Sequence, residues 1–110
     1  MSVISSVSAT QASTNTSALV TGSILPAWMG LAVSFTIVNA GLDTISWVVY
    51  GGNDSLLADK VVVQATADIA KDASGSYSAF VAPYSFYGVY IVSKVNGAPG
   101  TVTLRGVVKG

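Results

Sequence analysis

Hydrophobic and polar residues alternate along most of this chain, most clearly between residues 31 and 54. Leu, Val, Phe and Ile occupy the odd positions from 31 to 37, and Ile45, Trp47 and Val49 repeat the pattern. Period-2 alternation rich in β-branched and aromatic residues predicts half-buried strands. Asn39–Asp43 separates the two runs with residues that favour turns. We therefore expect residues 31–54 to form a hairpin.

The same pattern predicts five further strands, at residues 17–24, 60–70, 76–82, 84–95 and 101–108. Alanines in the second segment also fit a helix, but its β-branched residues favour a strand. Turn residues at 71–75 and 96–100 separate the later segments. About seven short strands without a helix predict an all-β, antiparallel two-sheet β-sandwich of jelly-roll or immunoglobulin-like topology. We expect one core to contain Phe35, Ile37, Trp47, Val49 and Leu104.

Residues 1–16 are rich in Ser, Thr and Ala and contain no continuous apolar face. We expect a flexible N-terminal arm there, and a sandwich domain over residues 17–110. Such a segment is either a disordered terminus or an arm that becomes ordered against a neighbouring subunit. Val3, Ile4 and Val7 would be its anchors.

Aromatic residues gather at residues 84–95, a segment with two apolar faces. Such clusters usually pack in cores or interfaces, although a carbohydrate-stacking platform is the alternative. Proline and glycine predict a loop at Pro26–Gly30, and we expect the tryptophan of this loop to cover the core. The interaction candidates from these two segments are Trp28, Tyr84, Phe86, Tyr87 and Tyr90.

Composition indicates a surface that is covered by neighbours. The chain has 110 residues, which fit one domain, and only 9% are charged, against about 25% in ordinary domains. The polar part of the surface must therefore consist of Ser, Thr, Asn and Gly in place of ionised side chains, and such a weakly charged surface suits contact with other proteins. Five basic and five acidic residues leave no basic stripe for nucleic acid. Residues 18–40 contain breakers and lack flanking Lys or Arg, so we expect neither a membrane span nor a signal peptide.

The sequence offers little for catalysis, because His, Cys and Glu are all absent. Disulfides, thiolate or imidazole metal sites and the commonest bases and nucleophiles are thereby excluded. Most of the aspartates fall in or beside predicted turns, where we expect them to cap backbone N–H groups. Asn53, Asp54 and Asp59 could offer oxygens to calcium, but they lack the spacing of a calcium loop. We expect no catalytic residue, no cofactor and no metal.

Three segments together resemble small β-sandwich structural proteins of tailed bacteriophages, of the head-decoration or tail-associated type. They are VNAG (38–41) leading to WVVYGGND (47–54), APYSFYGVYI (82–91) and GAPGTVTLRG (97–106). The resemblance covers residues 31–108. It implies a non-enzymatic virion component, assembled in the host cytoplasm as a homo-oligomer, that stabilises the particle by contacts with itself and with other virion proteins such as the major capsid protein.

Two alternatives remain at this point. A carbohydrate-binding or adhesive module would be favoured if the Tyr and Trp side chains formed one exposed platform. An enzyme would need an acid–base pair, which the sequence does not display.

Overall fold

The structure is a computed structural model that describes residues 2–27, 32–41, 43–94 and 101–110. These residues form nine strands and no helix, which confirms the all-β prediction. The strands are β1 (Val3–Ala12), β2 (Ala18–Leu19), β3 (Leu25–Pro26), β4 (Ala32–Asn39), β5 (Ile45–Gly52), β6 (Val61–Ile69), β7 (Ser74–Ala79), β8 (Phe86–Ser93) and β9 (Thr101–Lys109). Nowhere in the described ranges is there a helix with the length and apolar character needed to span a membrane.

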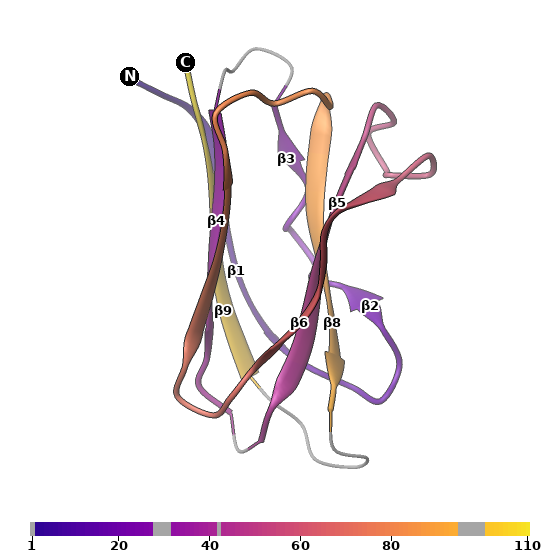
Figure 1. The fold of residues 1–110 in the computed structure, drawn as a ribbon, viewed down its shortest axis with the longest axis vertical. Coiled ribbons are helices and arrows are strands. Elements are labelled where there is room, and N and C mark those ends of the chain that lie inside the picture. Colours follow the sequence, from indigo (N-terminus) through magenta and orange to yellow (C-terminus); the bar gives the residue numbers. More distant parts are fainter. Residues whose placement is uncertain (1, 28–31, 42, 95–100) are drawn as a thin grey trace.

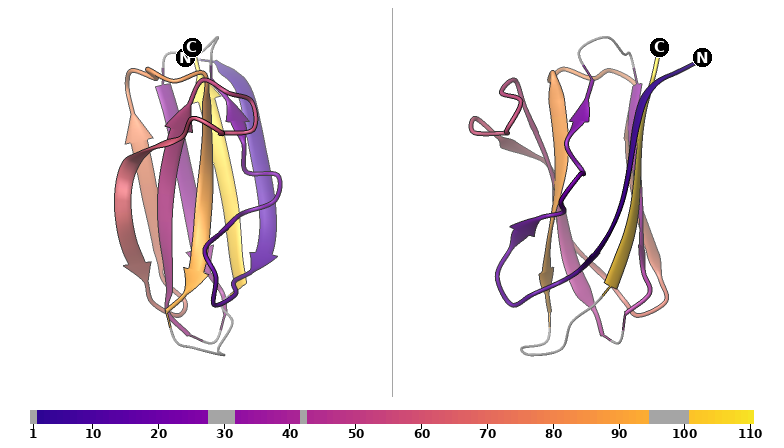
Figure 2. Two further views of the ribbon diagram at one scale, coloured as in Figure 1. Left: turned by 90° about the vertical axis from the view of Figure 1, so that its right-hand side faces the viewer. Right: turned by 180° about the vertical axis from the view of Figure 1, so that it is seen from behind.

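The strands form two sheets that pack face to face (Figure 1). The four-stranded sheet has the order β1-β9-β4-β7, and the five-stranded sheet has the order β2-β8-β5-β6 with β3 also beside β8. Every strand pair is antiparallel. The predicted antiparallel two-sheet β-sandwich is confirmed. Both termini lie at the same end of it, side by side (Figure 2).

The expected hairpin at residues 31–54 is wrong, because β4 and β5 belong to different sheets. The chain crosses between the sheets at the corner after Asn39. The Asn39 side chain donates to the carbonyl oxygens of Asp43 (2.8 Å) and Ile69 (3.0 Å), and its oxygen accepts from the Gly41 N–H (3.0 Å). Turn residues indicate that a chain reverses, but they do not indicate whether the two strands pair or face each other.

The expected flexible arm is instead largely the edge strand β1, which pairs with β9 along its whole length. Its inward side chains also reach the opposite sheet. Ser5 Oγ donates to the Pro26 carbonyl at 2.7 Å, and the Gln11 amide bonds the Leu19 carbonyl and the Thr21 N–H. These contacts add to the packing of Val7 and Ala9 against the core, because the inward face of β1 is only partly apolar.

Two other boundaries differ from the expectation of about seven strands. The strand expected at 17–24 is replaced by β2 and β3, two-residue strands on either side of a turn. Pro26, expected in a loop, lies in β3. β7 begins at Ser74, inside the predicted turn at 71–75, and ends before Phe80.

The core lies between the inner faces of the two sheets. Phe35, Ile37, Trp47, Val49 and Leu104 are all buried in it, as predicted. The Phe35 ring lies against Gly106 of β9, where a Cβ atom would come within 2.6 Å of Phe35 Cε1. Close packing therefore couples β4 to β9 through a residue that must be small.

Candidate interaction surfaces

The predicted aromatic cluster is divided between the two faces of β8. Tyr87 is fully buried, and its ring packs near those of Tyr84 (6.1 Å) and Tyr77 (6.5 Å). Burial raises the pKa of Tyr87 above its usual value, although the Tyr84 N–H bond to its hydroxyl acts in the opposite direction. Phe86 and Tyr90, one position and three positions away, lie on the outer face. The cluster therefore does not form one exposed platform.

Tyr90 instead contacts Tyr50 on the outer face of the five-stranded sheet. Their ring centroids are 5.0 Å apart in an edge-to-face arrangement, and Lys60 Nζ lies 5.5 Å from both centroids. Because β5 and β8 are neighbours, this pair depends on strand register that the sequence alone does not give. The arrangement is a small cation–π group, which holds the Lys60 side chain against the sheet.

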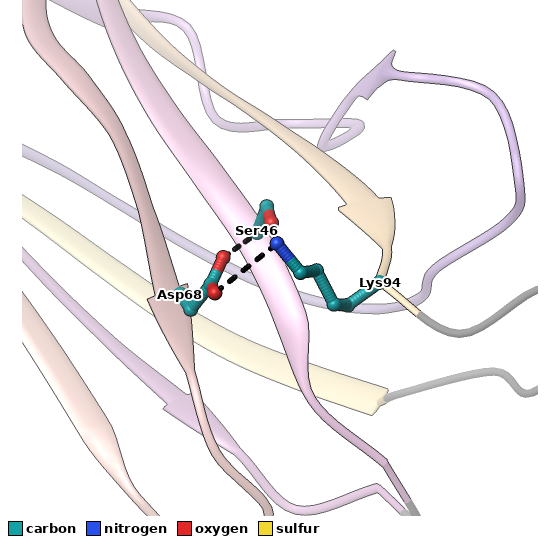
Figure 3. Close-up of polar contacts among 3 residues, drawn as sticks. All are labelled: Ser46, Asp68 and Lys94. Carbon is teal, nitrogen blue, oxygen red and sulfur yellow. Dashed lines mark hydrogen bonds and ion pairs between the residues drawn. The ribbon is translucent and has the colours of Figure 1, made fainter.

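A polar group lies near the other end of the same outer face (Figure 3). Asp68 accepts a hydrogen bond from Ser46 Oγ at 2.7 Å and forms an ion pair with Lys94 at 3.3 Å. The Ser46 bond, followed by Lys94, lowers the pKa of Asp68. A carboxylate whose ionised form is stabilised by a hydrogen bond and an ion pair is a weak general base. This group joins β5, β6 and the end of β8.

The loop between β5 and β6 confirms the capping role expected of turn aspartates. Asp59 accepts the N–H groups of Asn53 and Asp54, and these bonds lower the pKa of Asp59. Asp54 in turn accepts the N–H groups of Leu56 and Ala58. No cluster of three or more His, Cys, Asp or Glu suited to a metal occurs in the described residues.

Two of the three most exposed large apolar side chains in the described residues lie where β7 leaves the four-stranded sheet; the third is Leu56 in the β5–β6 loop. Phe80 is 86% exposed and Val81 is 76% exposed. Phe80 also helps to line a shallow groove of about 230 Å³ on the outer face, together with Ser34 and Ser78. Both residues fall inside the strand predicted at residues 76–82, so the sequence pattern did not indicate their exposure. The run Phe-Val before Ala82-Pro83 was the available signal, since proline tends to end a strand.

Two of the N-terminal anchor candidates, Val3 and Ile4, lie at the same end of the four-stranded sheet as Phe80 but on the opposite edge strand, because Val3 pairs with Lys109 and Lys109 pairs with Ala32 at the start of β4. Val3 is 55% exposed and Ile4 is 43% exposed, whereas Val7 is half-buried and packs against the core. Trp28 lies outside the described residues. Val3 and Ile4 therefore add to the apolar character of the end that carries Phe80.

Hydroxyl groups, and few charges, line the outer face of the four-stranded sheet. Cross-strand pairing places Ser8, Arg105, Thr36 and Ser76 in one row across it. The exposed side chains of β1, β9, β4 and β7 on this face include Ser6, Ser8, Thr10, Thr36, Ser74, Ser76, Ser78, Thr101 and Thr103. This matches the expectation that Ser and Thr replace ions on the surface.

No family model and no curated protein matches this chain. Among solved structures, the crystal structure of PirA is similar, with a TM-score of 0.60, 11% identity and coverage of 88% of this chain and 90% of that one.

A protein of Bacillus endospore appendages, described as a novel family of disulfide-linked pili, is similar with a TM-score of 0.54 and 14% identity, over 96% of this chain and 87% of that one. The SPBc2 prophage-derived protein YomS has a TM-score of 0.46 and 14% identity, over 97% and 98% of the two chains, which is too low a score to support an argument. At these identities the similarity to PirA and to the appendage protein shows a shared fold.

Proposed function

We propose that this chain is a non-enzymatic structural subunit of a virion, a capsid-decoration or tail-associated protein. It works as a homo-oligomer and binds other virion proteins such as the major capsid protein. The observation that carries the proposal is the apolar end of the sandwich, where Phe80 and Val81 are largely exposed after β7 at one edge of the four-stranded sheet and Val3 and Ile4 are partly exposed on β1 at the other edge. Large apolar groups gathered at one end of a weakly charged domain favour a protein contact.

Two further features support a structural role. The outer face of the four-stranded sheet carries hydroxyls, which can pack against a neighbour without the desolvation penalty of ions. The fold is also used by a protein of endospore appendages described as pili, so a sandwich of this kind is compatible with repetitive assembly. Virion location rests on the resemblance of residues 31–108 to phage structural proteins.

The polar groups of the structure support a non-enzymatic protein. Asp68 and Asp59 both have lowered pKa values and are bonded to several donors. Each therefore stays ionised and is a poor proton acceptor at neutral pH. Their hydrogen bonds join strands or close a loop, which is a structural role.

Light scattering on the full-length protein, followed by co-sedimentation with virus particles, tests the proposal. We expect a concentration-dependent oligomer that binds particles, and loss of particle binding in the double variant Phe80→Ser, Val81→Ser. The matched control is Leu56→Ser, which removes an equally exposed apolar side chain from the β5–β6 loop. A protein that stays monomeric, ignores particles and binds a glycan array through Tyr50 and Tyr90 would favour the carbohydrate-binding module instead.

A further inference from the structure

β7 forms one edge of the four-stranded sheet and has a partner strand, β4, on one side. The Asn39 N–H donates to the Ala73 carbonyl, so residue 73 directs its backbone groups toward β4. Successive residues of a strand direct their backbone groups to opposite sides, so the odd-numbered residues of β7 also face β4. The N–H and C=O groups of the even-numbered residues therefore point away from the sheet. These residues are Ser74, Ser76 and Ser78.

The edges of the five-stranded sheet have features that discourage strand addition, and β1, although uncharged, is interrupted near its start, whereas β7 is regular throughout. β6 pairs irregularly with β5 at two points and carries Asp68. β1 has a register shift after Val3 and is bonded through Ser5 to the opposite sheet. β2 and β3 have two residues each. β7 pairs with β4 over six consecutive residues without a shift, and contains neither a charge nor a proline.

The composition of β7 fits a second copy of the same strand. A two-fold contact places a strand against itself, so that any charge near its centre would meet a like charge. The sequence SGSYSA avoids this penalty and leaves only small hydroxyl side chains on the outer face. A charged partner would gain nothing from these residues.

The exposed apolar groups beside β7 are also self-complementary. Phe80 continues the outer-face series after Ser78, and Val38, which is 43% exposed, lies beside Ser74 at the opposite end of the strand. If Tyr77 lies opposite its own copy, Phe80 of each chain lies opposite Ser74 of the other. Each phenyl ring then extends over a small serine toward the other chain's Val38.

We infer that two copies of this chain pair through β7, antiparallel about a two-fold axis at Tyr77, and so join their four-stranded sheets into one continuous sheet. Ser76 of one copy and Ser78 of the other form hydrogen-bonded pairs, with about four new backbone bonds in total. The inference rests on the self-association in the proposed function and names the contact that produces it. A six-residue edge is about 20 Å long, shorter than a contact of about 800 Å² per partner requires, so the dimer is expected to be concentration-dependent.

Ser76→Pro tests the pairing. The Ser76 N–H points outward, so proline removes a donor of the dimer without removing one from the β4 ladder. Ser76→Ala is the matched control, because it keeps the backbone donor and changes only the side chain. By analytical ultracentrifugation we expect the proline variant to lose at least tenfold in dimer affinity and the alanine variant to match the wild type. Circular dichroism should show that both variants are folded.

Cysteine cross-linking tests the register, and the chain has no cysteine of its own. In an equimolar mixture of Ser76→Cys and Ser78→Cys, mass spectrometry should find the mixed disulfide at well above twice the yield of either like-with-like disulfide, which is the ratio that random pairing gives. A mixed disulfide at only that random ratio, or a dimer unaffected by Ser76→Pro, would overturn the β7 contact and leave self-association through another surface. A wild-type protein that is monomeric at millimolar concentration would overturn both this contact and the oligomer of the proposed function.

Discussion

Asn39 is the buried polar side chain at the corner where the chain passes from β4 to β5. Its amide donates to two backbone carbonyls, those of Asp43 and Ile69, and accepts from the Gly41 N–H. The corner thereby connects the end of β4 both to the start of β5 and to the end of β6. Asn39→Ala removes all three hydrogen bonds and leaves three backbone groups without that partner.

The loss of stability in Asn39→Ala can be estimated from the number of hydrogen bonds that the variant lacks. A hydrogen bond contributes about 1 kcal/mol net, and a buried group left without a partner costs about 1–3 kcal/mol. Three bonds therefore give a loss of at least about 3 kcal/mol in the free energy of unfolding. A domain of this size has about 5–15 kcal/mol in total, so the variant should fold but unfold at a clearly lower urea concentration.

Urea unfolding followed by tryptophan fluorescence measures this loss, with Asn53→Ala as the control. The Asn53 side chain accepts one exposed bond, from the Ser85 N–H at 3.1 Å, so its loss should cost less than about 1 kcal/mol. If Asn39→Ala loses less than about 1 kcal/mol at an unchanged m-value, the bonds at this corner do not stabilise the fold.

Asn39→Asp tests the hydrogen bonds alone, because aspartate has nearly the same size and shape as asparagine but cannot donate through an amide. The carboxylate would face two carbonyl oxygens in a buried site, which favours its protonated form and raises its pKa in the folded state. A raised pKa gives stability that is present below the unfolded value of about 3.9 and is lost as pH rises. The deficit relative to the wild type should therefore be smallest near pH 3.5 and should grow toward pH 7.

Three further predictions concern the core, its tyrosines and β1. Phe35→Ala should cost about 3–5 kcal/mol, because Phe35 is fully buried against Gly106; a loss below about 1 kcal/mol in urea would place its ring outside the core. Burial raises the pKa of Tyr77 and Tyr87, so the stability that they contribute should be complete below about pH 10 and should fall as pH rises through the raised values. Tyr87→Phe should make this fall in stability smaller, and an unchanged pH profile in that variant would contradict the prediction. Deletion of residues 2–12 removes β1 from beside β9 and should abolish cooperative unfolding, whereas a disordered arm could be removed without effect.

The alternation of apolar residues was enough to predict the strands from β4 onward and the shared core. β4, β5 and β9 each place one alternating series of apolar side chains in the interior, as their period-2 pattern requires, while Val38 of β4 lies on an outer face. The pattern could not identify strand partners. The inward side of a strand is set by its sequence, whereas its neighbours depend on how distant segments meet, as the sheet crossing at Asn39 shows.

β1 was missed for a different reason. Its inward residues include Ser5 and Gln11. Their polar side chains can lie on the inward face because they form hydrogen bonds with backbone groups of the segment that carries β2 and β3. Such contacts have no periodic signature. In contrast, the division of the aromatic cluster could have been predicted, because positions 87 and 90 have opposite parity and a strand directs them to opposite faces.

The position of β9 between β1 and β4 has a consequence for the synthesis of the protein. During translation, β1 and β4 leave the ribosome long before β9 is made. These two strands do not pair with each other in the native sheet, because β9 lies between them. All strands of the five-stranded sheet are synthesised before β9. The five-stranded sheet can therefore form while the four-stranded sheet that packs on its apolar face is still incomplete.

Closing the sheet across nearly the whole chain length is a non-local and therefore slow event. Nascent chains that stop short of residue 101 should consequently bind chaperones or aggregate, and full-length chains should gain protease resistance in one late step, when the last strand enters the gap.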